Sequence, residues 1–274
     1  MTFKPARLPP DLDAFGAIDS HAHLDSETFG DDLEGVLSRA WNAGIRAILA
    51  VAASESPDIY ARTTALAARN ARVFAALGIH PHNASLAEIL EPPLLARLED
   101  PKVVALGEIG LDFHYRFSPE EVQKDVMHRQ VGLALDKGLP VILHVREAHA
   151  QSLAILDSLS ARHRGVVHCF TGGPREAEAY LERGLHISIP GVVTFGARAG
   201  ELAEAVRIIP EDRLLVESDT PFLAPHPFRG RRNEPALVAL VVKCVARLRG
   251  TQPEVLAGVT AANTLRLFGM DDAC

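Results

Sequence analysis

The sequence has few cysteines and no excess of positive charge, and each shortage excludes a class of protein. Cys169, Cys244 and Cys274 are an odd number without metal-site spacing, so we expect reduced thiols and no disulfide framework. The formal net charge of −7 argues against nonspecific coating of nucleic acid, which depends on clustered lysine and arginine. A nucleic-acid substrate stays open, because bound divalent cations and the arginine-rich segment 229–232 add positive charge locally.

Long apolar runs and aromatic residues are also scarce. No segment approaches the roughly 18 uninterrupted apolar residues of a membrane span, and the start of the chain lacks a signal-peptide apolar segment. Together with the reduced thiols, this predicts a cytoplasmic location without membrane contact. Only 5% of the residues are aromatic, so surfaces for stacking nucleic-acid bases are few. Apolar residues are abundant, at 47% of 274 residues, and this size suits one α/β barrel of about 250 residues.

Short β-type runs alternate with helical patterns along the chain. One helix start is Ser118-Pro119-Glu120-Glu121, with serine as cap and proline at the first position. The alternation predicts a parallel sheet closed into a slightly irregular (β/α)₈ TIM barrel, one domain spanning 1–274. We expect residues 1–14 to be an extended lead-in and 271–274 a loose end. The predicted strands are 16–22, 45–53, 73–80, 102–108, 139–145, 165–170, 186–191 and 213–218.

An open, doubly wound sheet is the alternative arrangement of such a pattern. It requires a glycine-rich phosphate-binding turn directly after the first strand. At that position the sequence has His21-Ala22-His23. The barrel is therefore the favoured fold.

Residues that can bind metal ions close several of the predicted strands. A buried apolar run such as 141–143 predicts a strand of a parallel sheet, and an ionisable residue at its end needs an explanation. In barrel enzymes the active site is built at the carboxyl ends of the strands. The candidate ligands are His21, His23, Glu108, His144, His168 and Asp219.

The number of these ligands indicates two metal ions. A single catalytic zinc-like ion uses three protein ligands, whereas four histidines and two carboxylates suit two divalent ions about 3.5–4 Å apart. Side chains alternate along a strand, so His21 and His23 are expected to point the same way. We predict that Glu108 bridges the ions, because its side chain is long and lies near the middle of the strand order. The predicted division gives His21, His23 and Asp219 to one ion, and His144 and His168 to the other.

Such a pair of ions is typical of hydrolases. Water held between the ions is acidified enough to supply hydroxide near neutral pH. Asp219, beside that water, is the predicted general base and later the acid for the leaving group. Mixed imidazole and carboxylate ligation accepts Mg²⁺, Mn²⁺ or Zn²⁺, so the sequence does not fix the metal.

Seven segments occur in a fixed order between residues 19 and 235. They are Asp-Ser-His-Ala-His-Leu-Asp (19–25), Gly-Ile-His-Pro-His (78–82), Gly-Glu-Ile-Gly-Leu-Asp (107–112), His-Val-Arg-Glu-Ala (144–148), His-Cys-Phe-Thr-Gly (168–172), Glu-Ser-Asp-Thr-Pro (217–221) and Arg-Gly-Arg-Arg-Asn-Glu-Pro (229–235). In these segments the chain resembles the TatD family of metal-dependent deoxyribonucleases, in the amidohydrolase-like barrel superfamily. The resemblance implies the same six metal ligands and 3′-to-5′ exonuclease cleavage of DNA, single-stranded or at 3′ ends. Many related barrels bridge their metals with a carbamylated lysine, but here Glu108 ends the fourth strand and Lys102 lies at its start.

Further residues are candidates for substrate binding. The resemblance places His80 at the substrate, as a phosphate contact. Arg146 lies two residues after His144, and it is expected either to hold a phosphate by two hydrogen bonds or to pair with Glu147 or with a carboxylate behind the metal ligands. Arg229 follows the last strand, where barrels often bind phosphate, although it could instead brace the loop. For Asn233 and Glu234 we expect a structural role only.

Other acidic and aromatic residues have supporting roles in this interpretation. Asp19 is expected to orient His21, and Asp112 and Glu217 either orient other ligands or stabilise loops. The family commonly has a pair of tyrosines after Gly-Leu-Asp, whereas this chain has Phe113-His114-Tyr115-Arg116. Phe113 and Tyr115 are the candidates for stacking bases there.

Two other functions compete with DNA cleavage. The same centre could hydrolyse the ester of a D-aminoacyl-tRNA, an activity also associated with TatD-like proteins, or another phosphoester. A non-catalytic metal-binding protein on a barrel scaffold is the alternative from another class. A degenerate site would be expected to lack at least one ligand, and all six are present.

Overall fold

The chain forms an eight-stranded parallel sheet with strand order β1 to β8, in a computed structural model that describes residues 4–25, 27–159 and 162–270. Each strand overlaps its predicted range, and β4 continues past its predicted end to Asp112. The strands are β1 (Ile18–Ala22), β2 (Ala47–Val51), β3 (Val73–Leu77), β4 (Val103–Asp112), β5 (Val141–Arg146), β6 (Gly165–Val167), β7 (His186–Ile189) and β8 (Leu214–Val216). The predicted loose end, 271–274, lies outside the described residues.

The sheet closes between β1 and the segment that follows β8. The backbone N–H of His23 donates to the Thr220 carbonyl at 2.8 Å, and that of Asp219 donates to the His21 carbonyl at 3.0 Å. These bonds continue the ladder beyond the three residues of β8. The barrel prediction is confirmed, and the open doubly wound alternative is wrong.

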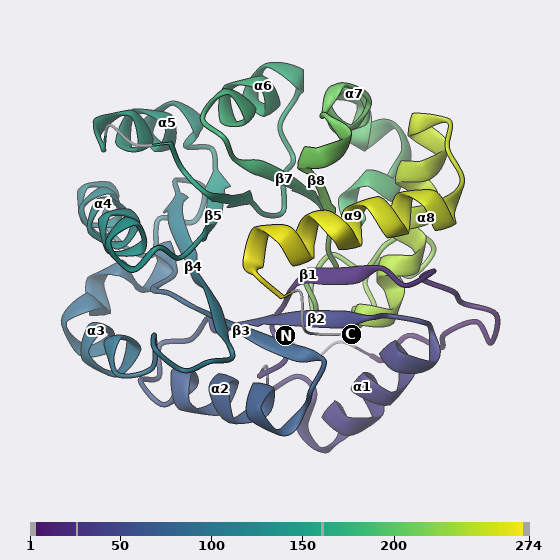
Figure 1. Cartoon of the computed structure of the whole chain (residues 1–274), viewed down its shortest axis with the longest axis horizontal. Coiled ribbons are helices and arrows are strands. Elements are labelled where there is room, and N and C mark those ends of the chain that lie inside the picture. The colour runs from purple at the N-terminus through teal and green to yellow at the C-terminus, as the bar shows by residue number, and fades with distance from the viewer. Residues whose placement is uncertain (1–3, 26, 160–161, 271–274) are drawn as a thin grey trace.

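Helices surround the barrel, as Figure 1 shows. They are α1 (Leu33–Asn42), α2 (Ile59–Arg69), α3 (Ala87–Leu95), α4 (Glu120–Lys137), α5 (His149–Ser158), α6 (Pro174–Glu182), α7 (Gly200–Ile208), α8 (Val238–Arg249) and α9 (Pro253–Phe268). Among the described residues, no helix is long and apolar enough to cross a membrane. The cytoplasmic location stays a prediction.

The core has two layers that follow from the alternation of side chains along the strands. Residues such as Ile48 and Leu143 pack outward against the helices, whereas Leu49 and Ile142 belong to a second cluster inside the barrel. That inner cluster includes Phe268 of α9, the helix that lies across the barrel in Figure 1. Since α9 covers one end of the barrel, the opposite end, where the strands finish, is the end that holds the site.

Candidate metal centre

Five imidazoles surround the Glu108 carboxylate at the carboxyl ends of the strands, and four of them are predicted metal ligands. Oε2 of Glu108 lies 3.4 Å from Nε2 of His21 and 3.6 Å from Nε2 of His23. Oε1 lies 2.6 Å from Nδ1 of His144 and 2.6 Å from Nε2 of His168. The two oxygens of one carboxylate therefore face two different pairs of predicted ligands, and Oε1 also faces His80.

The spacing within each pair suits a cation. Nε2 of His21 and Nε2 of His23 are 3.3 Å apart, and so are Nδ1 of His144 and Nε2 of His168. Ligands in a tetrahedron around a zinc-like ion, with bonds of about 2.1 Å, are separated by about 3.4 Å. The first pair with Oε2 of Glu108 matches this spacing. The second pair lies closer to Oε1 of Glu108, at hydrogen-bond distance, and offers the same donor types, two imidazole nitrogens and a carboxylate oxygen.

Two residues outside the predicted ligand set also come within ligand distance. Among the described residues, the groups whose donor atoms all lie within 4.8 Å of one another are His21–His23–Glu108, His80–Glu108–His144 and His21–His168–Glu217. His80 was predicted at the substrate and Glu217 only as an orienting or loop-stabilising residue. Asp219 belongs to none of the three groups, although its Oδ1 lies 3.6 Å from Nε2 of His23.

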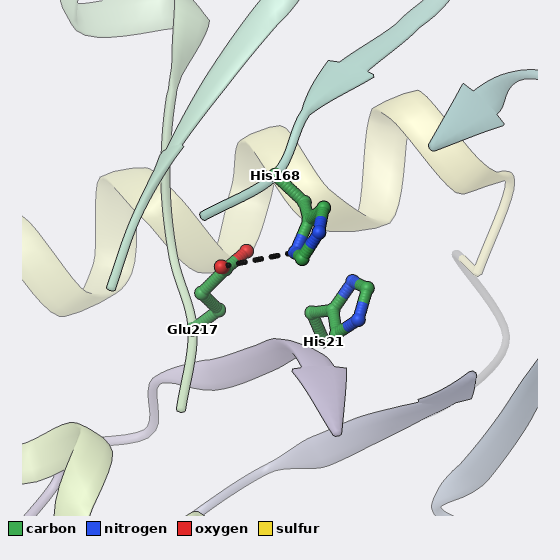
Figure 2. Close-up of side chains that lie close together, drawn as sticks. All are labelled: His21, His168 and Glu217. Atoms are coloured by element: carbon green, nitrogen blue, oxygen red, sulfur yellow. Dashed lines mark ion pairs between the residues drawn. The ribbon is translucent and has the colours of Figure 1, made fainter. Parts of the chain in front are cut away.

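Glu217 follows β8 and points toward the edge of the His168 ring, and the His21 ring lies against the face of that ring (Figure 2). Nδ1 of His168 and Oε1 of Glu217 are 3.4 Å apart, and the ring centroids of His21 and His168 are 3.8 Å apart. The Glu217 carboxylate also accepts the backbone N–H of Cys169 at 2.6 Å. Glu217 thus lies at ion-pair distance from Nδ1 of His168, which has no hydrogen-bond partner among the described residues, and the orienting role of Glu217 stays a prediction.

Two register shifts turn ligands into the barrel. In β1, Ser20 faces the interior, where its hydroxyl lies 2.9 Å from that of Ser188, so strict alternation would point His21 outward. The pairing of β1 with β2 shifts between Asp19 and Ala22, and the pairing of β4 with β5 shifts between residues 107 and 109. Such irregularities re-aim side chains next to active sites. They bring His21 and Glu108 to the same centre.

The carboxylates of the centre raise the pKa of some imidazoles, including His23, whereas burial lowers the pKa of His21 and of His80. Burial opposes ionisation of Glu108, but His168, His80 and His144 outweigh it and hold the Glu108 pKa well below its usual range. Burial also opposes charge on His23, yet Asp219 and Glu108 raise its pKa to about 9. A divalent cation meets the same demand for positive charge and displaces protons from its ligands when it binds.

Asp112 orients His144 from the side opposite Glu108. Oδ2 of Asp112 lies 3.3 Å from Nε2 of His144 and 2.8 Å from Nε2 of His82. Because Nδ1 of His144 faces Glu108, this contact fixes which ring nitrogen is directed into the centre. The orienting role that the sequence offers for Asp112 is consistent with this geometry.

Asp19 accepts the backbone N–H of His21 at 3.3 Å, and among the described residues no hydrogen bond joins it to the His21 ring, so the expected orientation of this imidazole by Asp19 is not observed. Its carboxylate accepts the Ser218 backbone N–H at 2.8 Å and the Ser218 hydroxyl at 2.6 Å. Nδ1 of His21 is buried and has no hydrogen-bond partner among the described residues. Burial raises the Asp19 pKa to about 8, against the effect of the Ser218 bonds. Asp19 instead fixes the segment that presents Asp219.

The predicted substrate contacts differ in position. Nε2 of His80 lies 3.3 Å from Oε1 of Glu108, so His80 borders the centre itself. Arg146 is exposed at the end of β5, with its guanidinium 4.7 Å from the centroid of the Tyr115 ring. The alternative pairing of Arg146 is not observed, since Glu147 contacts Nδ1 of His114 at 2.7 Å.

Arg229 is exposed and lies 4.3 Å above the Phe195 ring, which corresponds to the loop-bracing alternative. Asn233 has the expected structural contacts, since its Nδ2 donates to the carbonyls of Ser218 at 2.6 Å and Phe222 at 2.7 Å. Glu234 does as well, because it pairs with Nε of Arg39 at 2.6 Å. These residues tie the loop after β8 to the body of the barrel.

Of the two aromatic candidates for stacking, one is unsuitable. Phe113 is only 6% exposed and belongs to the core, so its predicted role in binding bases is wrong. Tyr115 is exposed, and Phe117, which the sequence interpretation overlooked, is more exposed still.

Comparison with known proteins gives a consistent result. An uncharacterized metal-dependent hydrolase, YabD, from Bacillus subtilis is 40% identical over 257 residues, 91% of this chain and 98% of that protein. A protein of Erwinia amylovora named 3′-5′ ssDNA/RNA exonuclease TatD is 40% identical over 258 residues, 92% of this chain and 99% of that protein. The crystal structure of a TatD homologue from Escherichia coli superposes with a TM-score of 0.87 at 33% identity, covering 93% of this chain and 99% of that one.

The sequence also matches the family described as TatD related DNase over residues 18–269. This range contains every strand of the barrel and all the residues of the candidate metal centre. The chain therefore belongs to the TatD related DNase family of metal-dependent hydrolases.

Proposed function

We propose that the protein is a nuclease that uses two divalent metal ions to remove nucleotides from the 3′ end of single-stranded DNA. The observation that carries the proposal is the Glu108 carboxylate, whose two oxygens face two separate pairs of imidazoles. The relative named 3′-5′ ssDNA/RNA exonuclease, similar over nearly its whole length, supports the substrate class and the direction of cleavage.

The proposed ligand set divides around Glu108. His21, His23 and Asp219 would hold one ion, His144 and His168 would hold the other, and Glu108 would contact both. Mg²⁺, Mn²⁺ and Zn²⁺ all accept such ligands. When bound, a pair of divalent ions supplies a water acidified to near-neutral pKa and neutralises charge on a phosphodiester.

Side chains of the protein carry out the proton transfer and bind the substrate. Asp219 borders the first site through His23, and it accepts the proton of the attacking water and returns one to the leaving oxygen. His80 lies at the rim of the centre beside Glu108 and contacts a phosphate oxygen. Arg146 and Arg229 offer planar guanidinium groups for phosphates further along the strand, Arg146 from the end of β5.

A labelled oligonucleotide tests the proposal. Purified protein, stripped of metal and reloaded with Mg²⁺, Mn²⁺ or Zn²⁺, should release mononucleotides progressively from the 3′ end of single-stranded DNA. EDTA should stop the release, and a 3′-terminal phosphorothioate linkage should slow it. Absence of release with every metal would overturn the proposal. Faster hydrolysis of a D-aminoacyl-tRNA ester than of DNA would replace the nuclease with an ester deacylase on the same centre.

A further inference from the structure

Two aromatic side chains are exposed side by side in the loop that follows β4. Tyr115 is 49% and Phe117 68% exposed. Their rings are stacked, with centroids 5.5 Å apart and planes inclined by 15°. β4 also holds Glu108, so this pair lies at the end of the barrel where the metal centre is built. Because aromatic surface in water is unfavourable, an exposed pair at this place suggests a ligand.

Hydrogen bonds fix the loop that presents the pair. Oδ1 of Asp112 accepts the backbone N–H groups of His114 and Tyr115, both at 2.9 Å. The sequence predicts that Ser118 caps α4, but this prediction is wrong. The Ser118 hydroxyl instead donates to the His82 carbonyl at 2.8 Å and accepts the Ser85 N–H at 3.0 Å. The loop is thereby anchored on both sides of the two rings. A surface that is ordered before binding loses little entropy when a ligand arrives.

His82 connects the pair to the metal centre. Its ring meets Phe117 edge-on at 4.7 Å and Tyr115 edge-on at 5.6 Å between centroids. The His82 ring is also 6.2 Å from that of His144, and both rings contact Oδ2 of Asp112. A single side chain therefore separates the exposed rings from a predicted metal ligand.

A cation completes the arrangement. The Arg146 guanidinium lies 4.7 Å from the centroid of the Tyr115 ring, and β5 carries both Arg146 and His144. Aromatic rings beside a positive charge are the combination that holds single-stranded nucleic acid, since the bases stack while the phosphates meet the cation. A folded protein partner would not need this combination next to a hydrolytic centre.

We propose that Tyr115 and Phe117 form a stacking platform for the bases next to the cleaved phosphodiester, with Arg146 contacting the adjoining phosphate. The proposal rests on the proposed nuclease function and adds how the strand is selected. Every base has an aromatic face, so the platform accepts all four with little preference. It accepts only bases that are free of a duplex, so paired 3′ ends must fray before they are cut.

Binding is measured in an Asp219→Asn background, which is not expected to cut, with a single-stranded DNA carrying 2-aminopurine near its 3′ end. The parent should quench the 2-aminopurine fluorescence through stacking. Tyr115→Leu with Phe117→Leu should abolish the quenching and weaken binding by about tenfold or more. Tyr115→Phe should retain both, because the ring stays. Val255→Ala is the matched control, since Val255 is an exposed apolar residue of α9 at the other end of the barrel.

Cleavage of an oligonucleotide with abasic sites at its last two positions gives a second readout. The wild type should have a KM about tenfold or more higher on this substrate than on the intact one, and the double leucine variant should lose that difference. Unchanged quenching and affinity in the double variant would overturn the platform even if the wild type is a nuclease. If the wild type cuts no DNA, the nuclease proposal fails, and the binding experiment alone decides whether the platform holds bases.

Discussion

Nδ1 of His168 and Oε1 of Glu217 lie 3.4 Å apart. The other ring nitrogen of His168 lies 2.6 Å from Oε1 of Glu108, so the imidazole is held between two carboxylates. A carboxylate behind a ligating histidine fixes the ring and makes its free nitrogen more basic.

Glu217→Gln should therefore weaken metal binding by about 10- to 100-fold without loss of the fold. Glutamine keeps an oxygen that accepts the Cys169 N–H, so the loop after β6 stays in place. Isothermal titration of the metal-free protein gives the affinity and the number of ions bound. An affinity equal to that of the wild type would contradict the orienting role. Loss of one whole ion would show that Glu217 is itself a ligand, as its group with His21 and His168 allows.

Asp219→Asn should keep the fold and lose turnover. Asparagine has the same shape but cannot accept the proton of the attacking water, and loss of such a group costs about 10²- to 10⁴-fold in rate. The measurement is kcat on single-stranded DNA, with the metal content of the same sample by elemental analysis. Asp212→Asn, at an exposed aspartate before β8, is the control and should match the wild type. Wild-type kcat in the Asp219 variant would assign the proton transfer to another group.

Metal removal should lower thermal stability as well as activity. Ions that bind the folded chain stabilise it by about 2.7 kcal/mol at a hundred times their dissociation constant. For a chain of this size that corresponds to roughly 5–10 °C in Tm. Scanning calorimetry before and after dialysis against EDTA measures the difference, which re-added metal should reverse. Glu108→Gln, which removes the shared carboxylate charge, should show a much smaller response to EDTA. An equal response in this variant would place the stabilising ion elsewhere.

The barrel and part of the centre follow from the sequence because alternation along a strand is a local property. His144 has the same parity as Ile142, which lies inside the barrel, and Asp219 has that of Leu215. The alternation of side chains along apolar runs is therefore enough to predict that such side chains point into the barrel.

The rest depends on departures from alternation and on loops. The register shift within β1 that turns His21 inward produces no periodic pattern in the sequence from which it could be predicted. The same is true of the register shift beside Glu108. This also holds for the aromatic residues after β4, where the sequence interpretation names Phe113 and overlooks Phe117. Hydrophobicity cannot separate the two phenylalanines, and only the tertiary fold buries one and exposes the other.

His186 should make the fold sensitive to acid. It begins β7, is buried, and lies with Nδ1 3.3 Å from the Gly165 carbonyl oxygen. Burial lowers its pKa from 6.5 to about 4, and the positive charge of Arg213 adds to this. Well above pH 6.5 the ring is neutral in both states and contributes nothing to the pH dependence. As the pH falls from 6.5 toward 4, the unfolded chain binds a proton that the folded chain refuses, so stability decreases with decreasing pH.

The decrease due to His186 should reach about 2 kcal/mol at pH 5 relative to pH 7. His186→Gln cannot take up that proton, so its free energy of unfolding should fall by about 2 kcal/mol less than that of the wild type over the same interval. Urea unfolding at pH 7 and pH 5 measures both values. His128→Gln, at an exposed histidine of α4, is the control and should follow the wild type. Equal losses in the wild type and in His186→Gln would show that His186 accepts its proton in the folded state, and the acid sensitivity would then arise from other groups.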